Sequence, residues 1–166
     1  MREADWEQMT LERLAEEPLG WQPLTGRDIA PGATSAAGHP AYARLGEQPQ
    51  RESWSEVAIP SRLRAALRRL NPEVPREYLD QAMAEILRPQ SADPIAENKR
   101  IHDYLTEGYR LTYIADGAEH NPTIRLLGSH PEQNEWLAVN QVIVATGEVE
   151  RRFDVVLYLN GMPVVV

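Results

Sequence analysis

The chain has 166 residues, which is long enough to bury one sizeable hydrophobic core. Its net charge of −8 at pH 7 argues against a protein that coats nucleic acid through a basic face. It has no cysteine, which excludes disulfides and thiolate metal sites and fits a cytoplasmic protein.

One helix and little other regular structure are expected near the start of the chain. Leu11 and Leu14 lie three apart and predict an amphipathic helix over residues 3–17. A short strand is expected at residues 21–24. The stretch at 25–52 is rich in Gly, Pro, Ala and Ser, so we expect a long irregular connection there. No apolar run approaches the roughly 18 residues that a membrane-spanning helix needs, and no membrane partner is expected.

A helical region is predicted at residues 61–107. Residues 61–70 place leucines on one face and arginines on the other, which is typical of an amphipathic helix. A second helix is expected at residues 75–87. Asp93 precedes a proline and is suited to cap a third helix, which is expected to end near Gly108.

The remainder of the chain, residues 109–166, is expected to form a meander of strands separated by turn residues. The predicted strands are residues 109–115, 123–127, 136–146, 153–159 and 163–166. Helices followed by strands indicate a mixed α/β (α+β) fold. Because the last apolar strand has no polar ending, we expect the chain to be a fragment cut within this domain.

Asp154 is the first candidate for chemistry. It lies in the most strand-like run of the chain, where aspartate is uncommon. A carboxylate there is costly unless it is paired, solvated or bound to a metal ion. The alternative is an aspartate at a strand edge that forms an ion pair with Arg151 or Arg152.

Two acids on the first helix are further candidates. Glu3 and Glu7 fall on the same stripe as Leu11 and Leu14, so they continue the face that is expected to meet the core. Such an acid could reach a site above a sheet. The alternative is a solvated first turn, in which acids are favoured by the helix dipole.

The arginines of the helix at 61–70 could meet DNA phosphates or another domain. Arg64, Arg68 and Arg69 are weak candidates for DNA contact, because a solvated basic face is the usual reason for such a pattern. The four histidines show no metal-ligand spacing, and no glycine-rich phosphate loop is present.

The last stretch of the chain resembles a known signature. Residues 151–166 read Arg-Arg-Phe-Asp, a hydrophobic run, Asn-Gly-Met-Pro and a second hydrophobic run. This is similar to the PD-(D/E)xK nuclease motif of the restriction (motor) subunit of Type I restriction–modification enzymes. That pattern continues with Glu-Leu-Lys, and Phe153 replaces its usual proline.

Other segments resemble the same family in the same order. They cover most of the chain outside the connection at 25–52. These segments are residues 3–7, 52–57, 62–72, 97–102 and 134–141.

The resemblance implies a restriction-endonuclease-like mixed sheet flanked by helices, with residues 1–166 as a partial N-terminal endonuclease domain. It implies a Mg²⁺-dependent nuclease in which Asp154 is a metal ligand and Glu7 or Glu3 is a helix acid that aligns metal or water. In the full subunit an ATP-driven DNA translocase would follow. The implied partners are duplex DNA and the methylation and specificity subunits.

The hairpin that follows Asp154 makes a geometric prediction. A two-residue turn at Asn160-Gly161 would place position 167 opposite Asp154, whereas a three-residue loop would place position 168 there. The glutamate of the family pattern falls at position 168, so we expect a three-residue, bulge-type loop. Since the Glu and Lys are not among the 166 residues, we expect the fragment alone not to cleave DNA.

Two other functions stay open at this point. A non-catalytic module would use the helical region at 61–107 to dock subunits or DNA, and Asp154 would be structural. An acidic mimic of DNA is suggested by the net charge, but acids and arginines are interspersed along the chain instead of segregated.

Overall fold

The computed structural model describes residues 3–33 and 50–166, and of residues 3 and 4 it describes the backbone alone. The chain divides into two compact units. Residues 1–62 and 135–166 form what we call the sheet unit, and residues 63–134 form the helical unit. The described part has four α-helices, a mixed four-stranded sheet and two small hairpins, so the expected mixed α/β class is confirmed.

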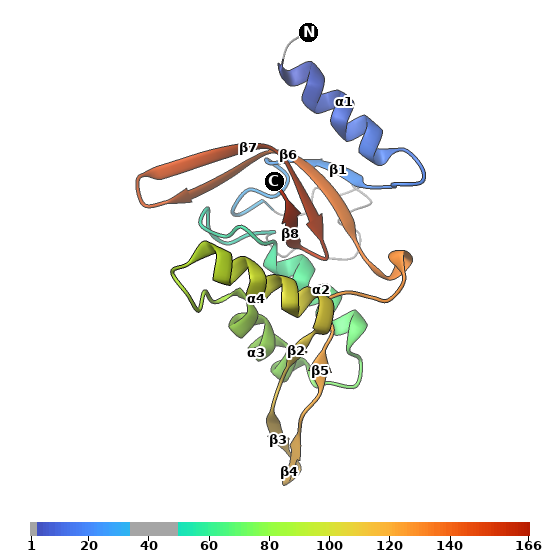
Figure 1. Cartoon of the computed structure of the whole chain (residues 1–166), viewed down its shortest axis with the longest axis vertical. Coiled ribbons are helices and arrows are strands. Elements are labelled where there is room, and N and C mark those ends of the chain that lie inside the picture. Colours follow the sequence, from blue (N-terminus) through green and yellow to red (C-terminus); the bar gives the residue numbers. More distant parts are fainter. Residues whose placement is uncertain (1–2, 34–49) are drawn as a thin grey trace. The chain divides into compact units, whose positions relative to one another are not determined.

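The sheet unit is built around one sheet in the order β1-β6-β7-β8 (Figure 1). Strand β1 is parallel to β6, while β6–β7 and β7–β8 are antiparallel hairpin pairs. Its elements are α1 (Glu3–Ala15), β1 (Gln22–Thr25), β6 (Trp136–Thr146), β7 (Val149–Leu159) and β8 (Met162–Val165).

The core of the sheet unit lies on one face of this sheet. Alternate residues of each strand point to the same face, and the β-branched and aromatic residues of β6 and β7 supply most of that face. Its buried members are Leu24, Ile29, Ile59, Leu137, Val139, Val142, Val156 and Tyr158. Ile29 and Ile59, which lie in loops outside the strands, pack into the same core as residues of β1, β6 and β7. This shared core holds the end of β1 against the middle of β6 and β7.

The hairpin between β7 and β8 differs from the expectation. Asn160 and Gly161 have φ values of 51° and 83°, and Leu159 pairs with Met162, so the turn has two residues. Positive φ at both positions is the reason that an Asn-Gly pair suits this turn. The predicted three-residue loop is therefore wrong. The one-residue offset comes instead from a register shift between Leu157 and Tyr158.

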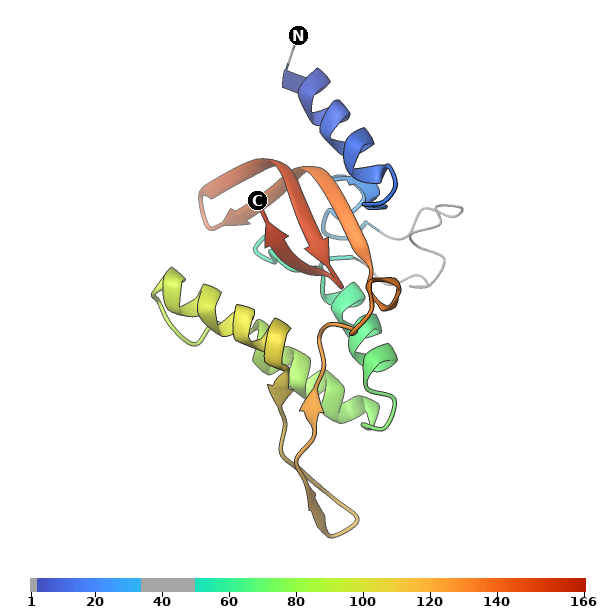
Figure 2. The same cartoon turned by 45° about the vertical axis from the view of Figure 1, so that its right-hand side comes forward.

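The helical unit contains most of helix α2 (Pro60–Leu70), two further helices and a long irregular hairpin (Figure 2). The division between the units falls within α2, after Arg62. The elements are α2 (Pro60–Leu70), α3 (Arg76–Leu87), α4 (Pro94–Glu107), β2 (Tyr109–Arg110), β3 (Tyr113–Ala115), β4 (Ala118–His120), β5 (Thr123–Ile124) and a 3₁₀ turn, η2 (Pro131–Gln133).

Local signals explain the helices of this unit. Leu63 and Leu67 of α2 are fully buried, as the amphipathic pattern predicts. The Asp93 carboxylate accepts a hydrogen bond from the backbone N–H of Ile95 at 2.9 Å, so the predicted cap is confirmed. Helix α4 ends at Gly108, whose φ of 87° suits glycine.

The connection expected at residues 25–52 lies partly outside the described residues. Its described ends contain the last residue of β1 and an isolated parallel bridge between Pro31 and Arg51. In the parts of the chain that are described, no helix is long and apolar enough to cross a membrane.

Candidate functional site

Asp154 lies in the middle of β7, and its side chain is exposed. Among the described residues its side chain takes part in no ion pair or hydrogen bond, so the alternative of an ion pair with Arg151 or Arg152 is not observed. Its carboxylate is thus solvated and available. The structure gives this aspartate no structural partner within the sheet.

The residue opposite Asp154 is Gln141 of β6. Asn140 pairs with Val155, and the ladder resumes in the same register at Val142, so Gln141 and Asp154 face each other across the two strands. Gln141 has a φ of 53°, in the left-handed region that residues other than glycine rarely adopt. Such backbone conformations occur most often at turns and functional sites.

Gln141 connects this position to helix α1. Its Nε2 donates a hydrogen bond of 2.6 Å to Oε2 of Glu7, which is half-buried. One predicted helix acid and the predicted strand acid therefore flank the same glutamine. The side chain of Glu3 lies outside the described residues, so the choice between Glu3 and Glu7 stays a prediction.

Gly26, the residue after β1, allows the chain to pass close to the backbone of Asn140 and Gln141. Its N–H donates to the carbonyl oxygen of Asn140 at 2.7 Å. A Cβ atom at position 26 would lie 1.9 Å from the Gln141 carbonyl oxygen, so no other residue fits without a backbone shift. The unusual conformation of Gln141 is accordingly held from the β1 side by close backbone packing.

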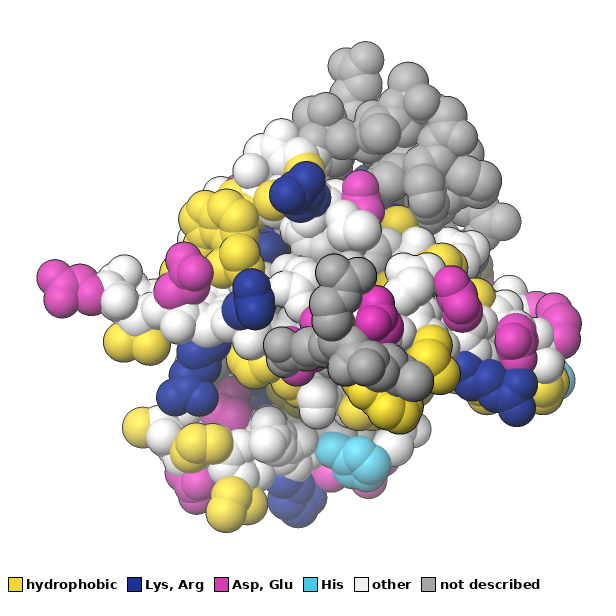
Figure 3. Space-filling model, turned by 90° about the horizontal axis from the view of Figure 1, so that it is seen from above, with side chains coloured by type: hydrophobic (Ala, Val, Ile, Leu, Met, Phe, Trp, Pro, Cys, Tyr) yellow, Lys and Arg dark blue, Asp and Glu magenta, His cyan; other side chains and the backbone are white. Residues whose placement is uncertain are grey.

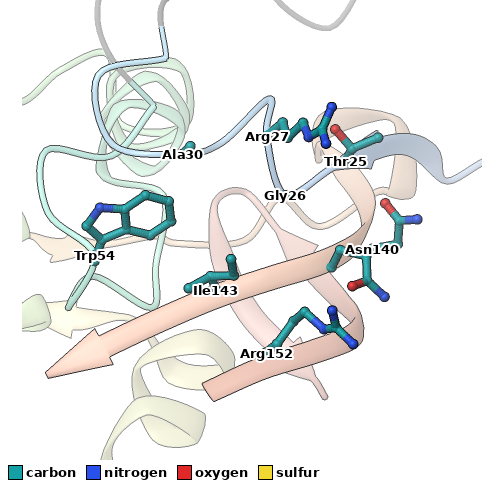
Figure 4. Close-up of a pocket in the computed structure, with 9 residues that line it drawn as sticks. Thr25, Gly26, Arg27, Ala30, Trp54, Asn140, Ile143 and Arg152 are labelled. Carbon is teal, nitrogen blue, oxygen red and sulfur yellow. The ribbon is translucent and has the colours of Figure 1, made fainter. Parts of the chain in front are cut away.

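A hollow of about 530 Å³ opens beside Gln141 (Figure 4). Its apolar end contains Trp54, Ala30 and Ile143, and Arg27 and Arg152 lie at the other end with Asn140. The full lining is Thr25, Gly26, Arg27, Ala30, Trp54, Asn140, Gln141, Ile143 and Arg152. Every one of these residues belongs to the sheet unit.

A buried arginine supports the apolar end of the hollow. Arg51 is fully buried and donates hydrogen bonds to the carbonyl oxygens of Ile29, Glu56 and Ile143, at 2.7, 2.9 and 3.0 Å. Its guanidinium also lies 5.7 Å from the ring centroid of Trp54. Burial lowers the pKa of Arg51 from its usual value because the charged form loses its hydration.

The predicted DNA-contact arginines of α2 have partners inside the helical unit. Arg64 and Arg68 both form ion pairs with Asp80 of α3, each at 3.1 Å. Arg69 donates to the carbonyl oxygen of Gln133 at 3.1 Å. These contacts give the three arginines a structural role, and their contact with DNA stays a prediction.

Acidic and basic side chains are interspersed over the face seen in Figure 3. A protein that mimics DNA needs a continuous acidic surface, so this distribution gives that alternative no support.

Within the described ranges, no three His, Cys, Asp or Glu residues gather in a way that could hold a metal ion.

The donor chemistry around Gln141 nevertheless fits Mg²⁺ as a partial ligand set. Mg²⁺ prefers oxygen ligands, is usually held by one or two carboxylates, and keeps several waters. Asp154 is an exposed carboxylate without a side-chain partner, and Glu7 is hydrogen-bonded to Gln141, the residue opposite Asp154. These two residues are the ones that would hold the ion.

Sequence reasoning assigned no chemistry to Gln141, Arg27 or Arg152. The signal for Gln141 was its place in the segment 134–141, which carried part of the family resemblance. Only the register of β6 against β7 brings it opposite Asp154. The two arginines come from elements far apart in the sequence, so no local pattern could unite them.

The chain is similar in sequence to two known proteins. The chain is 29% identical over 168 residues to the Type I restriction enzyme HindI endonuclease subunit of Haemophilus influenzae, covering 100% of this chain and 14% of that protein. It is 23% identical over 124 residues to the putative Type I restriction enzyme MjaIXP endonuclease subunit of Methanocaldococcus jannaschii, covering 72% of this chain and 12% of that protein. No solved structure matches.

The chain therefore spans about one seventh or less of the length of these relatives. The family model for the Type I restriction enzyme R protein N terminus matches residues 1–166, the whole of the sequence. The chain belongs to the family of N-terminal regions of Type I restriction enzyme R proteins.

Proposed function

We propose that the chain is the N-terminal part of the DNA-cleaving subunit of a Type I restriction–modification system. In that longer protein, which we call the parent subunit, it would supply most of a Mg²⁺-dependent endonuclease directed at unmodified foreign DNA. ATP-driven translocation would belong to later domains, and the partners would be duplex DNA and the methylation and specificity subunits. The family membership and the two named endonuclease subunits support this proposal.

The observation that carries the proposal is the arrangement around Gln141. An exposed, unpaired carboxylate lies within a strand where aspartate is disfavoured. Opposite it stands a residue with a rare backbone conformation that is hydrogen-bonded to a second carboxylate, Glu7. A purely structural sheet has no need of this combination.

Each residue has a role that follows from its surroundings. Asp154 would present its carboxylate to the ion from the open face of β7. Glu7 would orient either the ion or the attacking water, because Gln141 holds one of its oxygens in place and leaves the other available. A bound Mg²⁺ would lower the pKa of a water molecule and stabilise negative charge on the phosphate oxygens.

The register shift near the β7–β8 turn supports the expected place of the glutamate that follows Asp154 in the family pattern. Leu157 pairs with Val165, one residue later than the turn alone would give. In that shifted register, position 168 would stand opposite Asp154, where the family pattern carries its glutamate. The 166 residues contain neither that glutamate nor the lysine, so we expect a polypeptide limited to them not to cleave DNA.

The test is cleavage of an unmodified plasmid by the parent subunit, assembled with its partner subunits and supplied with Mg²⁺ and ATP. The Asp154→Ala variant is expected to lose more than about 100-fold of the cleavage rate, since losing groups that merely support metal ligands already costs about 10–100-fold. The Glu7→Gln variant is expected to lose less. ATP hydrolysis in the same samples is expected to stay at the wild-type level.

Asp80→Asn is the control, because it also removes a carboxylate, partly exposed, but lies in the helical unit. It should cleave like the wild type. Cleavage that survives Asp154→Ala would contradict the proposal and favour a non-catalytic docking module. Activity of the 166-residue polypeptide that Asp154→Ala abolishes would refute the expectation that it is inactive alone.

A further inference from the structure

The hollow beside Gln141 has unpaired arginines. Of the arginines described in the sheet unit, Arg13 pairs with Glu16, Arg51 binds three carbonyl oxygens, and Arg62 pairs with Glu135. The remaining three are exposed, and their side chains form no hydrogen bond or ion pair with any described residue: Arg27, Arg151 and Arg152. Two of these three, Arg27 and Arg152, line the hollow.

This placement is informative because the chain is acidic overall. With a net charge of −8, exposed arginines have many carboxylates available as partners. Arg27 follows β1 and Arg152 lies on β7, and both line the hollow together with Asn140 (Figure 4). Two guanidinium groups without partners that line one hollow are suited to bind phosphate, since each can offer two parallel N–H donors.

Asn140 adds a second sign of a missing ligand. Its Oδ1 atom is buried and has no hydrogen-bond partner among the described residues. A buried polar atom without a partner costs roughly 1–3 kcal/mol, so it indicates that a water or a ligand completes the site. Asn140 lines the hollow together with Arg27 and Arg152.

The apolar end of the hollow suits the sugar or the base of a nucleotide. Trp54 is 42% exposed there, with Ala30 and Ile143 beside it. An exposed indole is a platform for a sugar or a base, whereas a site for a free anion has no use for it. The buried Arg51 holds this end in shape through its bond to the Ile143 carbonyl oxygen.

We propose that this hollow binds a phosphodiester of the DNA strand, with Arg27 and Arg152 on the phosphate and Trp54 against the neighbouring nucleoside. The subsite adjoins Gln141, the residue that lies opposite Asp154 and is hydrogen-bonded to Glu7. This inference rests on the proposed function and names how that site holds its substrate. It moves the expected DNA contact from α2 to the sheet unit.

The test is fluorescence anisotropy of a labelled duplex of about 25 base pairs, with the 166-residue protein in EDTA so that no cleavage occurs. The Arg27→Gln/Arg152→Gln double variant is expected to bind at least about 10-fold more weakly than the wild type. Its slope of log affinity against log salt should fall by about 1, the value for one lost phosphate contact. The Arg27→Lys/Arg152→Lys variant should recover part of the affinity, since it restores the charge but not the paired donors.

Arg151→Gln is the matched control for Arg152→Gln. Arg151 is adjacent, exposed and unpaired, but side chains alternate along a strand and Arg151 does not line the hollow. It should change binding much less than Arg152→Gln. Equal losses from the two single variants, wild-type affinity in the double variant, or no detectable duplex binding by the wild type would each overturn the inference. Displacement of the duplex by 10 mM inorganic phosphate at constant ionic strength, to the same degree as by unlabelled duplex, would show a simple anion site and would also overturn it.

The same assay separates this inference from the proposed function. Asp154→Ala removes a carboxylate that repels phosphate when no metal is present, so it should bind duplex at least as tightly as the wild type. If cleavage by the parent subunit proves independent of Asp154 while binding still depends on Arg27 and Arg152, the nuclease proposal fails and the subsite stands. If Asp154 is essential and the arginine variants bind normally, the subsite fails alone. Circular dichroism of each variant confirms that it is folded.

Discussion

Helix α2 and the hollow of the sheet unit use arginine in opposite ways. On α2, Arg64 and Arg68 share the carboxylate of Asp80, and Arg69 is bonded to a carbonyl oxygen. Around the hollow, Arg27 and Arg152 are exposed without partners, although the chain is strongly acidic. Sequence patterning drew attention to the first group, because three arginines on one helix are visible in a linear reading.

The difference teaches that several arginines along one helix do not by themselves make a surface that can bind an anion. Ion pairs within α2 and α3 tie two helices together and leave little charge for a partner. Arg27, after β1, and Arg152, on β7, keep their charge available. Four expectations for the two units follow, in order of decreasing size.

The largest effect concerns the buried tyrosine that supports the sheet unit. Burial raises the pKa of Tyr158 to about 12, because the phenolate form would lose its hydration. Its folded pKa lies above the unfolded value of about 10, so the neutral form stabilises the fold below pH 10 and that stability is lost as pH rises toward 12. We expect a loss of about 2–3 kcal/mol between pH 9.5 and 12.5.

Urea unfolding across this pH range measures that loss. The Tyr158→Phe variant should be less stable at pH 8, because it lacks the hydrogen bond to the Val57 carbonyl oxygen, and should depend less on pH above 10. An unchanged alkaline transition in the variant would assign the effect to other groups.

Gly26→Ala is expected to destabilise the sheet unit by about 1–3 kcal/mol, because its Cβ would meet the Gln141 carbonyl oxygen at 1.9 Å. Gly32→Ala is the control, since that Cβ would meet nothing within 4 Å and only its φ of 76° would be strained. Chemical denaturation should rank Gly26→Ala as the more damaging. Equal losses would mean that close packing on Gln141 is unimportant.

Gln141→Leu keeps the size of the side chain but removes the donor to Glu7. With the parent subunit we expect cleavage to fall about 10–100-fold, as for groups that orient metal ligands, while ATP hydrolysis stays at the wild-type level. A joint loss of cleavage, ATP hydrolysis and stability would indicate a merely structural residue.

Asp80→Asn should have the smallest effect, about 0–1 kcal/mol on stability, because its ion pairs with Arg64 and Arg68 are partly exposed. The variant also leaves two arginines of α2 unpaired. If location matters more than charge alone, their release should leave duplex affinity within about 2-fold. A large gain in affinity would restore α2 as a DNA contact.

The sequence allowed the outline of the fold to be predicted where local chemistry is strong. Asp93 signals a helix start, and the long apolar runs at 136–146 and 153–159 signal the central hairpin. It failed at the β7–β8 turn, because the one-residue offset comes from a bulge near Leu157 that carries no distinctive residue.

The candidate site was predicted only where a single residue is unusual in its local sequence. An aspartate inside a strand is visible in the sequence, and so is a glutamate on an apolar stripe. Gln141 was not assigned a role, because its left-handed conformation and its position opposite Asp154 depend on strand register. Arg27 and Arg152 lie 125 positions apart in the chain (152 minus 27), and only the sheet brings them to one hollow.

The central claim is that Asp154 and Glu7, on either side of Gln141, form the metal-binding part of a nuclease site. The most direct measurement is paramagnetic broadening of backbone amide NMR signals by sub-stoichiometric Mn²⁺, used in place of Mg²⁺ on the 166-residue protein. We predict selective broadening at Asp154, Gln141 and Glu7 that excess Mg²⁺ reverses and that Asp154→Asn abolishes. Broadening that centres on Asp80 or other acids of the helical unit, or that persists in Asp154→Asn, would contradict the claim.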